Sequence, residues 1–179
     1  MKTRIFASFP ADELLLWGGN YRPYTIGGGQ FWRVVTYMFL HENLLHLGWN
    51  LLFLWRLGRL LDLLLGPVNT FAIYLFSGIG CALSSLCCSP TLIHVGASGG
   101  NAGLAGALIC LVVFAKLNLS QRNWRSVFLW AALLTPIAII SGFRTEGVDS
   151  AGHLGGFVSG FLIGAVFIWR KPMGLLKRL

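Results

Sequence analysis

The chain has 179 residues, of which 55% are hydrophobic and only 11% are charged, and its mean hydropathy is positive. These few charged side chains cannot cover the surface of a water-soluble globule of this length, and the composition therefore excludes an ordinary soluble domain. It indicates instead an all-α, polytopic membrane bundle. The formal net charge of +8 would suggest nucleic acid as the partner of a soluble chain. In a membrane protein the positions of the charges matter more than their sum, so we expect a lipid bilayer and no nucleic acid.

Residues 1–43 contain no stretch that could cross a bilayer, and we expect them to form an outer-face segment of short helices and loops. Leu14–Trp17 is too short to span and is predicted to lie at the membrane interface. Trp32 is predicted to anchor an amphipathic segment at the lipid headgroups. Arg33 could share that role or organise the loop through hydrogen bonds. The segment also lacks the continuous apolar core of a cleavable signal peptide.

The rest of the chain is dominated by long apolar stretches. A membrane-spanning helix needs about 20 mainly apolar residues, and short polar links between such stretches favour one compact bundle. We therefore predict a membrane domain over residues 44–170, followed by a basic tail over residues 171–179. The five transmembrane helices of this membrane domain are predicted near Leu44–Leu64, Val68–Leu86, Ser98–Phe114, Trp124–Ser141 and Ala151–Trp169.

Basic residues gather after the first predicted span, between the third and fourth, and after the fifth. These regions lie on one side of a serpentine with five spans, and the positive-inside rule assigns that side to the cytoplasm. The N-terminal segment and the links over residues 88–97 and 142–150 are then expected outside, as in a multi-pass protein of a bacterial inner membrane. The basic residues are Arg56, Arg59, Lys116, Arg122, Arg125, Arg170, Lys171, Lys177 and Arg178.

A run of small residues, Gly96–Gly103, opens the third span and contains Ser98. A serine flanked by residues without bulk can expose its hydroxyl group, which is typical of a nucleophile. The alternative is a packing interface, because the pairs Gly99/Gly103 and Ala102/Gly106 have the spacing that lets membrane helices approach closely.

The stretch that leads into the first span contains His41, His46 and Asn50. His46 and Asn50 are four residues apart and therefore share a helix face, while His41 lies nearer the surface. Polar groups inside a membrane are costly unless they have partners, so this cluster indicates either a functional site or a structural hydrogen bond between helices. We expect no metal ion, since neither a cysteine nor a carboxylate completes a convincing ligand set.

The last span carries Gly152, Gly156, Gly160 and Gly164, with His153 one step away from this row. Such a row lets one helix press against another over several turns. His153 could form an interhelical bond or, beside a serine, act as a base. Two further polar residues precede the two motifs. His94 is expected to be a solvated loop histidine, and Asp149 is expected to lie too near water to complete a catalytic triad.

Pro136 interrupts the fourth span. Proline can bend a helix and leave a carbonyl group without a partner. We interpret this span as a candidate mobile wall, with a static kink as the alternative.

The predicted topology brings the polar clusters to the outer ends of their spans. Acyl transfer needs a nucleophile, a base within hydrogen-bond reach, and donors for the oxyanion of the tetrahedral intermediate. Ser98 could be the nucleophile and His153 the base. Asn50, His46 and the Ser98 backbone amide could stabilise the oxyanion.

With these motifs in their order, the chain resembles the rhomboid family of intramembrane serine proteases. The resemblance implies a Ser98/His153 dyad that cleaves transmembrane protein substrates near the outer ends of their helices, without a cofactor or metal. It also implies that His46 and Asn50 stabilise the oxyanion and that the fourth span and the following loop gate substrate entry. The motifs are Trp32-Arg33, His41-x4-His46-x3-Asn50, Gly96–Gly99 and Ala151–Gly156.

The sequence departs from the family pattern in two ways. Ala102 stands where rhomboids commonly carry an aromatic residue stacked on the catalytic histidine, so we expect the His153 ring to be held less firmly. The first of the usual six spans is also absent before Trp17.

Two other classes of function fit the sequence less well. A catalytically silent rhomboid-like protein that binds membrane clients would be favoured by loss of Ser98 or His153, and both are present. A transporter or channel subunit would need ionisable residues along a polar path in mid-span, which the sequence does not show outside the site cluster.

Overall fold

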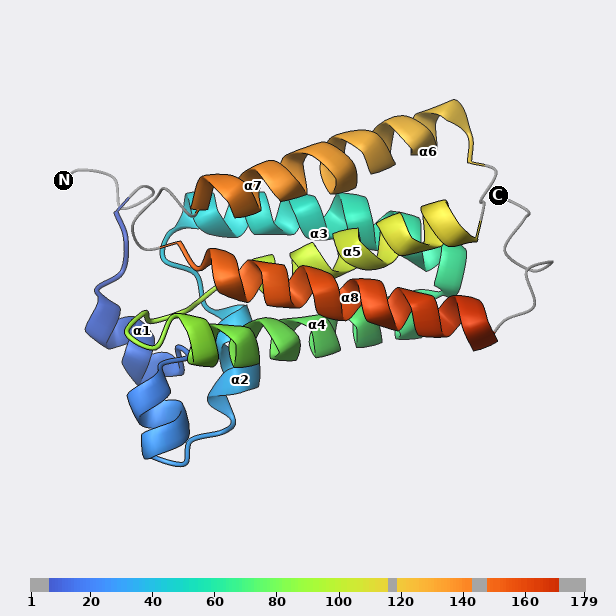
Figure 1. Ribbon diagram of the computed structural model, residues 1–179. Coiled ribbons are helices and arrows are strands. Elements are labelled where there is room, and N and C mark those ends of the chain that lie inside the picture. The colour runs from blue at the N-terminus through green and yellow to red at the C-terminus, as the bar shows by residue number, and fades with distance from the viewer. Residues whose placement is uncertain (1–6, 116–118, 143–147, 171–179) are drawn as a thin grey trace.

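The computed structural model describes residues 7–115, 119–142 and 148–170, and throughout these ranges the regular elements are helices. The prediction of an all-α membrane bundle is therefore confirmed. Figure 1 shows the long helices side by side, with the short N-terminal helices gathered at one end. The basic tail and most of the link over residues 142–150 lie outside the described residues. The elements are α1 (Ala11–Trp17), η1 (Pro23–Gly27), α2 (Arg33–Thr36), η2 (Tyr37–Phe39), α3 (Leu44–Leu65), α4 (Pro67–Cys88), α5 (Ser98–Phe114), α6 (Gln121–Ser126), η3 (Val127–Leu134), α7 (Thr135–Gly142) and α8 (Ser150–Arg170).

The N-terminal segment is organised around Arg33. Its guanidinium group is buried and donates hydrogen bonds to the carbonyl oxygens of Leu15 at 2.6 Å and Gly19 at 2.9 Å, and to Gln30 Oε1 at 2.7 Å. Trp32 remains 50% exposed. The structure therefore favours the loop-organising role for Arg33, while the exposure of Trp32 suits an interfacial anchor.

Helix α3 begins and ends at residues that favour helix termini. Asn43 caps its first turn, since its side-chain oxygen accepts a hydrogen bond from the His46 backbone amide at 2.8 Å. At the other end, Gly66 has a φ of 84°, which a residue with a side chain rarely adopts, and Pro67 then starts α4. This short turn makes α3 and α4 antiparallel neighbours.

The glycine row of α8 presses on α5, as its spacing predicts. A Cβ atom at Gly156 would collide with the Gly99 carbonyl oxygen, and one at Gly160 would collide with the Gly103 backbone. Gly152 differs from the others because its α-carbon faces the Asp149 carboxylate. The missing side chains thus allow the helix carrying His153 to touch the helix carrying Ser98.

The fourth predicted span is one continuous helix whose middle section, η3, is a π-helix. Pro136 has no amide hydrogen for the preceding turn, and the Thr135 hydroxyl group donates to the Trp130 carbonyl oxygen at 2.7 Å. The irregularity that Pro136 predicts therefore takes the form of a widened turn just before the proline.

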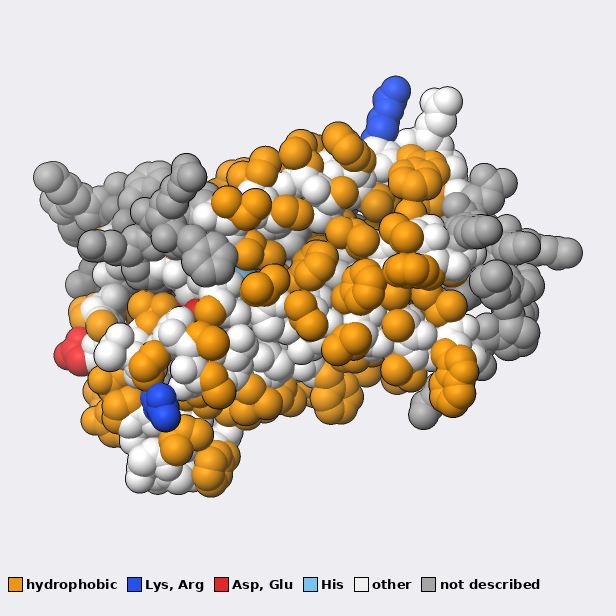
Figure 2. Space-filling view, viewed as in Figure 1, with side chains coloured by type: hydrophobic (Ala, Val, Ile, Leu, Met, Phe, Trp, Pro, Cys, Tyr) orange, Lys and Arg blue, Asp and Glu red, His pale blue; other side chains and the backbone are white. Residues whose placement is uncertain are grey.

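Within the described residues, three helical stretches are long and apolar enough to cross a membrane: Pro67–Cys88, Gln121–Ile140 and Ser150–Trp169. Helix α5 is apolar but shorter, at 17 residues, and α3 carries charged residues in its second half. On the face shown in Figure 2, hydrophobic side chains cover the flanks of the bundle. All five predicted spans are helices, and together they describe a multi-pass membrane protein.

Candidate active site

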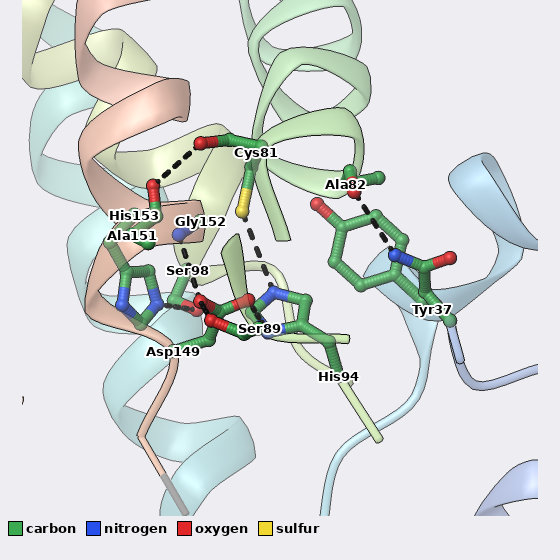
Figure 3. Close-up of polar contacts among 12 residues, drawn as sticks. Tyr37, Cys81, Ala82, Ser89, His94, Ser98, Asp149, Ala151, Gly152 and His153 are labelled. Atoms are coloured by element: carbon green, nitrogen blue, oxygen red, sulfur yellow. Dashed lines mark hydrogen bonds and ion pairs between the residues drawn. The ribbon is translucent and has the colours of Figure 1, made fainter. Parts of the chain in front are cut away.

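Ser98 and His153 lie within hydrogen-bond distance. The Ser98 Oγ and His153 Nε2 atoms are 2.6 Å apart, from the first residue of α5 and the first turn of α8 (Figure 3). Both side chains are partly exposed. The two residues that the sequence predicts as nucleophile and base are therefore brought together, as the contact between α5 and α8 requires.

The backbone just before Ser98 is shaped by Gly96. Its φ is 120°, and a Cβ atom there would lie 2.9 Å from His46 Cε1. Only glycine fits both the conformation and the close approach of the ring. The His46 ring thus lies against the loop that leads to Ser98.

Asn50 is buried one turn below His46, and its orientation is fixed from both sides. Its side-chain amide donates to the His46 carbonyl oxygen at 3.0 Å, and its Oδ1 accepts a hydrogen bond from Asn101 Nδ2 at 3.1 Å. Asn101 also donates to the Asn50 backbone carbonyl oxygen at 3.0 Å. Asn101 was not predicted from the sequence, although it is the one amide in the small-residue run after Ser98.

Two cavities meet at this cluster. One, of about 210 Å³, lies among the helices and is lined by all four predicted site residues together with apolar side chains of α3 and α7. The other, of about 410 Å³, is lined by His46, Ser98, His153 and residues of the outer links, including Glu42. The Ser98 hydroxyl group can therefore be approached from the helix side and from the loop side.

His94 and Asp149 are not solvated, so the expected exposure of both was wrong, although the Asp149 carboxylate pairs with His94 rather than with His153. Their side chains are buried, with His94 Nδ1 3.2 Å from Asp149 Oδ2. Burial by itself would lower the pKa of His94, but the neighbouring Cys81 sulfur and the Asp149 carboxylate outweigh it and raise that pKa to about 10. Burial would likewise raise the pKa of Asp149, but His94 holds it well below its usual range. Loop position alone could not reveal this mutual burial.

His41 accepts a hydrogen bond from the Ala97 backbone amide at 3.4 Å, and its ring packs edge-on against that of His46 at 5.2 Å between centroids. Burial, followed by the nearby His46, lowers the pKa of His41 to about 4, so the ring is neutral at pH 7. His41 therefore positions the serine loop from outside the cavity.

The fold and the site define a helical membrane protein with a serine and a histidine in contact where two cavities meet. The sequence matches the model of the rhomboid domain over residues 28–170. The chain therefore belongs to the rhomboid family.

Relatives in bacteria and protists agree with this assignment. The chain is 32% identical over 189 residues to the rhomboid protease AarA of Providencia stuartii, covering 92% of this chain and 66% of AarA. It is 31% identical over 154 residues to the rhomboid protease GluP of Bacillus subtilis, covering 86% of this chain and 29% of GluP. Rhomboid-like protease 3 of Toxoplasma gondii is 34% identical over 149 residues, which cover 82% of this chain and 55% of that protein. The chain thus spans between 29% and 66% of the length of these relatives.

Proposed function

We propose that this chain is an intramembrane serine endopeptidase that hydrolyses peptide bonds in the transmembrane helices of other proteins. The observation that carries the proposal is the 2.6 Å contact between Ser98 Oγ and His153 Nε2 at the junction of two cavities. Membership of the rhomboid family and relatives named as proteases support the same reaction class. We further propose a bacterial inner membrane as its location. The distribution of the basic residues then places the C-terminal end of α8 on the cytoplasmic side.

In the proposed mechanism His153 Nε2 accepts the Ser98 proton as Oγ attacks the substrate carbonyl carbon. The tetrahedral intermediate collapses when His153 returns that proton to the leaving amine, which breaks the peptide bond and leaves an acyl group on Ser98. A water molecule then gives a proton to His153 and its hydroxide to the acyl carbon. A second collapse releases the carboxyl product and returns the proton to Ser98.

The negative oxygen of each intermediate needs hydrogen-bond donors. The Ser98 backbone amide lies in the first turn of α5, where amides have no acceptor within the helix and the helix dipole favours negative charge. The Asn50 side-chain amide and the His46 ring line the same cavity. We assign these three groups to the oxyanion.

The two cavities suit the two reactants. The cavity among the helices has an apolar lining from Trp49, Phe53 and Ile139, and we assign it to the substrate helix. The loop-side cavity includes the Glu42 and Asp149 carboxylates, and we assign it to the hydrolytic water. The α7 segment, next to the first cavity, is then the wall that moves when a substrate enters.

Reaction with a fluorophosphonate probe in lipid tests the activated serine without a known substrate. We expect the parent to be labelled at Ser98, and Ser98→Ala and His153→Ala to abolish both labelling and cleavage of a reporter transmembrane helix. Ser120→Ala, which removes a helix-capping hydroxyl group far from the site, is the matched control and should react like the parent. Retained cleavage in either dyad variant would remove that residue from the mechanism, and an unreactive parent would favour a client-binding protein.

Asn50→Ala tests the oxyanion assignment separately. Removing one oxyanion donor typically lowers turnover by about 10²–10³-fold, so we expect a slow enzyme with nearly unchanged substrate affinity. The measurement is reporter cleavage at several substrate concentrations. Turnover equal to that of the parent would reassign Asn50 to structure.

A further inference from the structure

A second pair of contacting polar residues, His94 and Asp149, lies directly behind the Ser98/His153 dyad. His94 precedes Ser98 by four residues and Asp149 precedes His153 by four residues, and these two residues contact each other as Ser98 and His153 do. The His94 and Asp149 residues are only 4% and 3% exposed. An ionisable pair so deeply buried is costly to maintain, which favours a role for it beyond packing.

The Asp149 carboxylate joins three separate segments. Its Oδ1 accepts hydrogen bonds from the Ser89 hydroxyl group at 2.9 Å and from the Gly152 backbone amide at 2.9 Å. The second contact caps the first turn of α8, which carries His153. Its Oδ2 is buried and makes no hydrogen bond among the described residues. This oxygen forms an ion pair with His94 Nδ1 instead.

The His94 ring is held by its surroundings, between the Cys81 side chain and the Asp149 carboxylate (Figure 3). The two imidazole rings are 5.8 Å apart between centroids, at 66° to each other. His94 Nε2 lies 3.5 Å from Cys81 Sγ, and the Tyr37 ring packs on His94 at 4.9 Å between centroids. The backbone of His94 is also fixed, by paired hydrogen bonds with Asn20 at 2.8 and 2.9 Å.

Ala102 explains why this support is needed. It lines the same cavity as His153, but its methyl group is too small to brace an imidazole ring. The sequence therefore predicts a loosely held base. The structure instead has the His94 ring packed edge-on against the His153 ring.

We propose that the buried His94–Asp149 pair is a positioning device that fixes the His153 imidazole for proton transfer with Ser98. The inference rests on the proposed function, since it concerns the base of that reaction. Asp149 holds the first turn of α8 against the segment before α5, and the His94 ring supports His153 from the side. Neither residue touches the reacting atoms, so both are positioning residues rather than catalytic ones.

The size of the effect follows from the geometry of proton transfer. A displacement of about 1 Å in a reacting group can lower a rate by about 10²-fold. We expect His94→Gln and Asp149→Asn each to slow fluorophosphonate labelling of Ser98 by about 10- to 100-fold. Asn retains an oxygen that can cap α8, so this variant removes the charge and keeps the cap. The double variant should be little worse than either single one, because the two residues act as a unit.

Thr70→Val is the matched control. Thr70 is also a buried polar residue, but its hydroxyl group bonds to Gly66 at the far end of α4. It should label at the parental rate, even where its thermal stability falls. A comparable loss of labelling in Thr70→Val would attribute the effect to general destabilisation and overturn the proposal.

The pH dependence of labelling provides a readout that simple packing would not change. His94 faces Asp149 and His153 at the start of α8, Cys81 on α4, Tyr37 on η2 and His46 on α3. As His94 loses its proton near pH 10 the ion pair is lost, so labelling of the parent should fall there. This alkaline fall should be absent in His94→Gln. In Cys81→Ala, which removes one of the groups that raise the pKa of His94, the fall should persist but move to lower pH. A fall that disappears in Cys81→Ala and remains in His94→Gln would overturn the proposal.

Deuterium exchange at the histidine C2 position tests the same idea without activity. His153 is mobile if its support is lost, so its exchange should become faster in Asp149→Asn and His94→Gln and stay unchanged in Thr70→Val. If the parent is never labelled by the probe, the proposed function fails while this exchange still measures the support. If His153 exchanges equally in all variants, the positioning role fails even where labelling confirms the enzyme.

Discussion

At the scale of single residues, Asn101 determines which way the Asn50 amide points. Its Nδ2 donates to both oxygens of Asn50, which leaves the Asn50 amide hydrogens for His46 and for the cavity. Asn101→Leu keeps the volume but removes the donor, so we expect turnover to fall by about tenfold, less than for Asn50→Ala. Reporter cleavage measures the loss. Turnover below that of Asn50→Ala would assign Asn101 a direct role in place of an orienting one.

His41 makes the stability of the serine loop depend on pH. Its folded pKa of about 4 lies below the value near 6.5 expected for an unfolded chain, so the unfolded state binds more protons between these values. The contribution of neutral His41 is therefore present above pH 6.5 and is lost as the pH falls toward 4. His41→Gln keeps an acceptor but cannot titrate, so its thermal midpoint should fall less over this range. Parallel pH profiles for parent and variant would contradict this.

The residues that the sequence identified are those whose chemistry is visible in a short motif. Ser98 lies among glycines and His153 beside a glycine row, so both could be assigned as partners. His94 and Asp149 could not, because a histidine and an aspartate in separate links look solvated until the folded chain shows that they bury each other. Asn101 was hidden for a similar reason, since its role depends on Asn50, which is 51 residues away.

Among the helices, the contact between α5 and α8 sets the distance between Ser98 and His153. Adding a methyl group at Gly160 would force it into the Gly103 backbone, whereas one at Gly48 on α3 meets nothing within 4 Å. We expect Gly160→Ala to destabilise the fold by about 1–3 kcal/mol through overpacking and to slow labelling of Ser98. Gly48→Ala should be neutral or slightly stabilising, because alanine favours a helix. Thermal unfolding in detergent compares the two, and equal midpoints would refute the close-packing account.

The α6–η3–α7 helix is less regular than the other long helices, and the sequence located the reason at Pro136. It did not predict a π-helix, because a missing amide hydrogen can be accommodated by a bend, a widened turn or a side-chain bond. Here the Thr135 hydroxyl group completes the widened turn. Pro136→Ala should restore regular bonding and stiffen this wall, so we expect slower reporter cleavage with unchanged labelling by a small probe. Reporter cleavage at the parental rate would exclude a gating role for α7.

At the scale of the whole molecule, the orientation in the membrane can be tested with the cysteines. Cys87 and Cys88 are exposed at the end of α4 near the site, while Cys81 and Cys110 are buried. A membrane-impermeant maleimide added to intact cells should label only Cys87 and Cys88. Gln121→Cys, on exposed α6 at the opposite end, should be labelled in a Cys87→Ser, Cys88→Ser background only after permeabilisation. The reverse pattern would invert the predicted topology.

Apolar length and charge position were enough to predict five helices and their order, because a bilayer leaves a chain few alternatives. The short N-terminal helices and the Arg33 hydrogen bonds were less accessible, since irregular segments are determined by tertiary contacts.

The two cavities that meet at Ser98 also give its hydroxyl group two approaches, one between the helices and one through the loops. A long-chain, oily phosphonate would dissolve in the bilayer and arrive between the helices, whereas a small, charged one would diffuse in through the loops. The ratio of the two inactivation rates then measures which cavity gives easier access to Ser98. Selective inhibitors could be designed for either cavity.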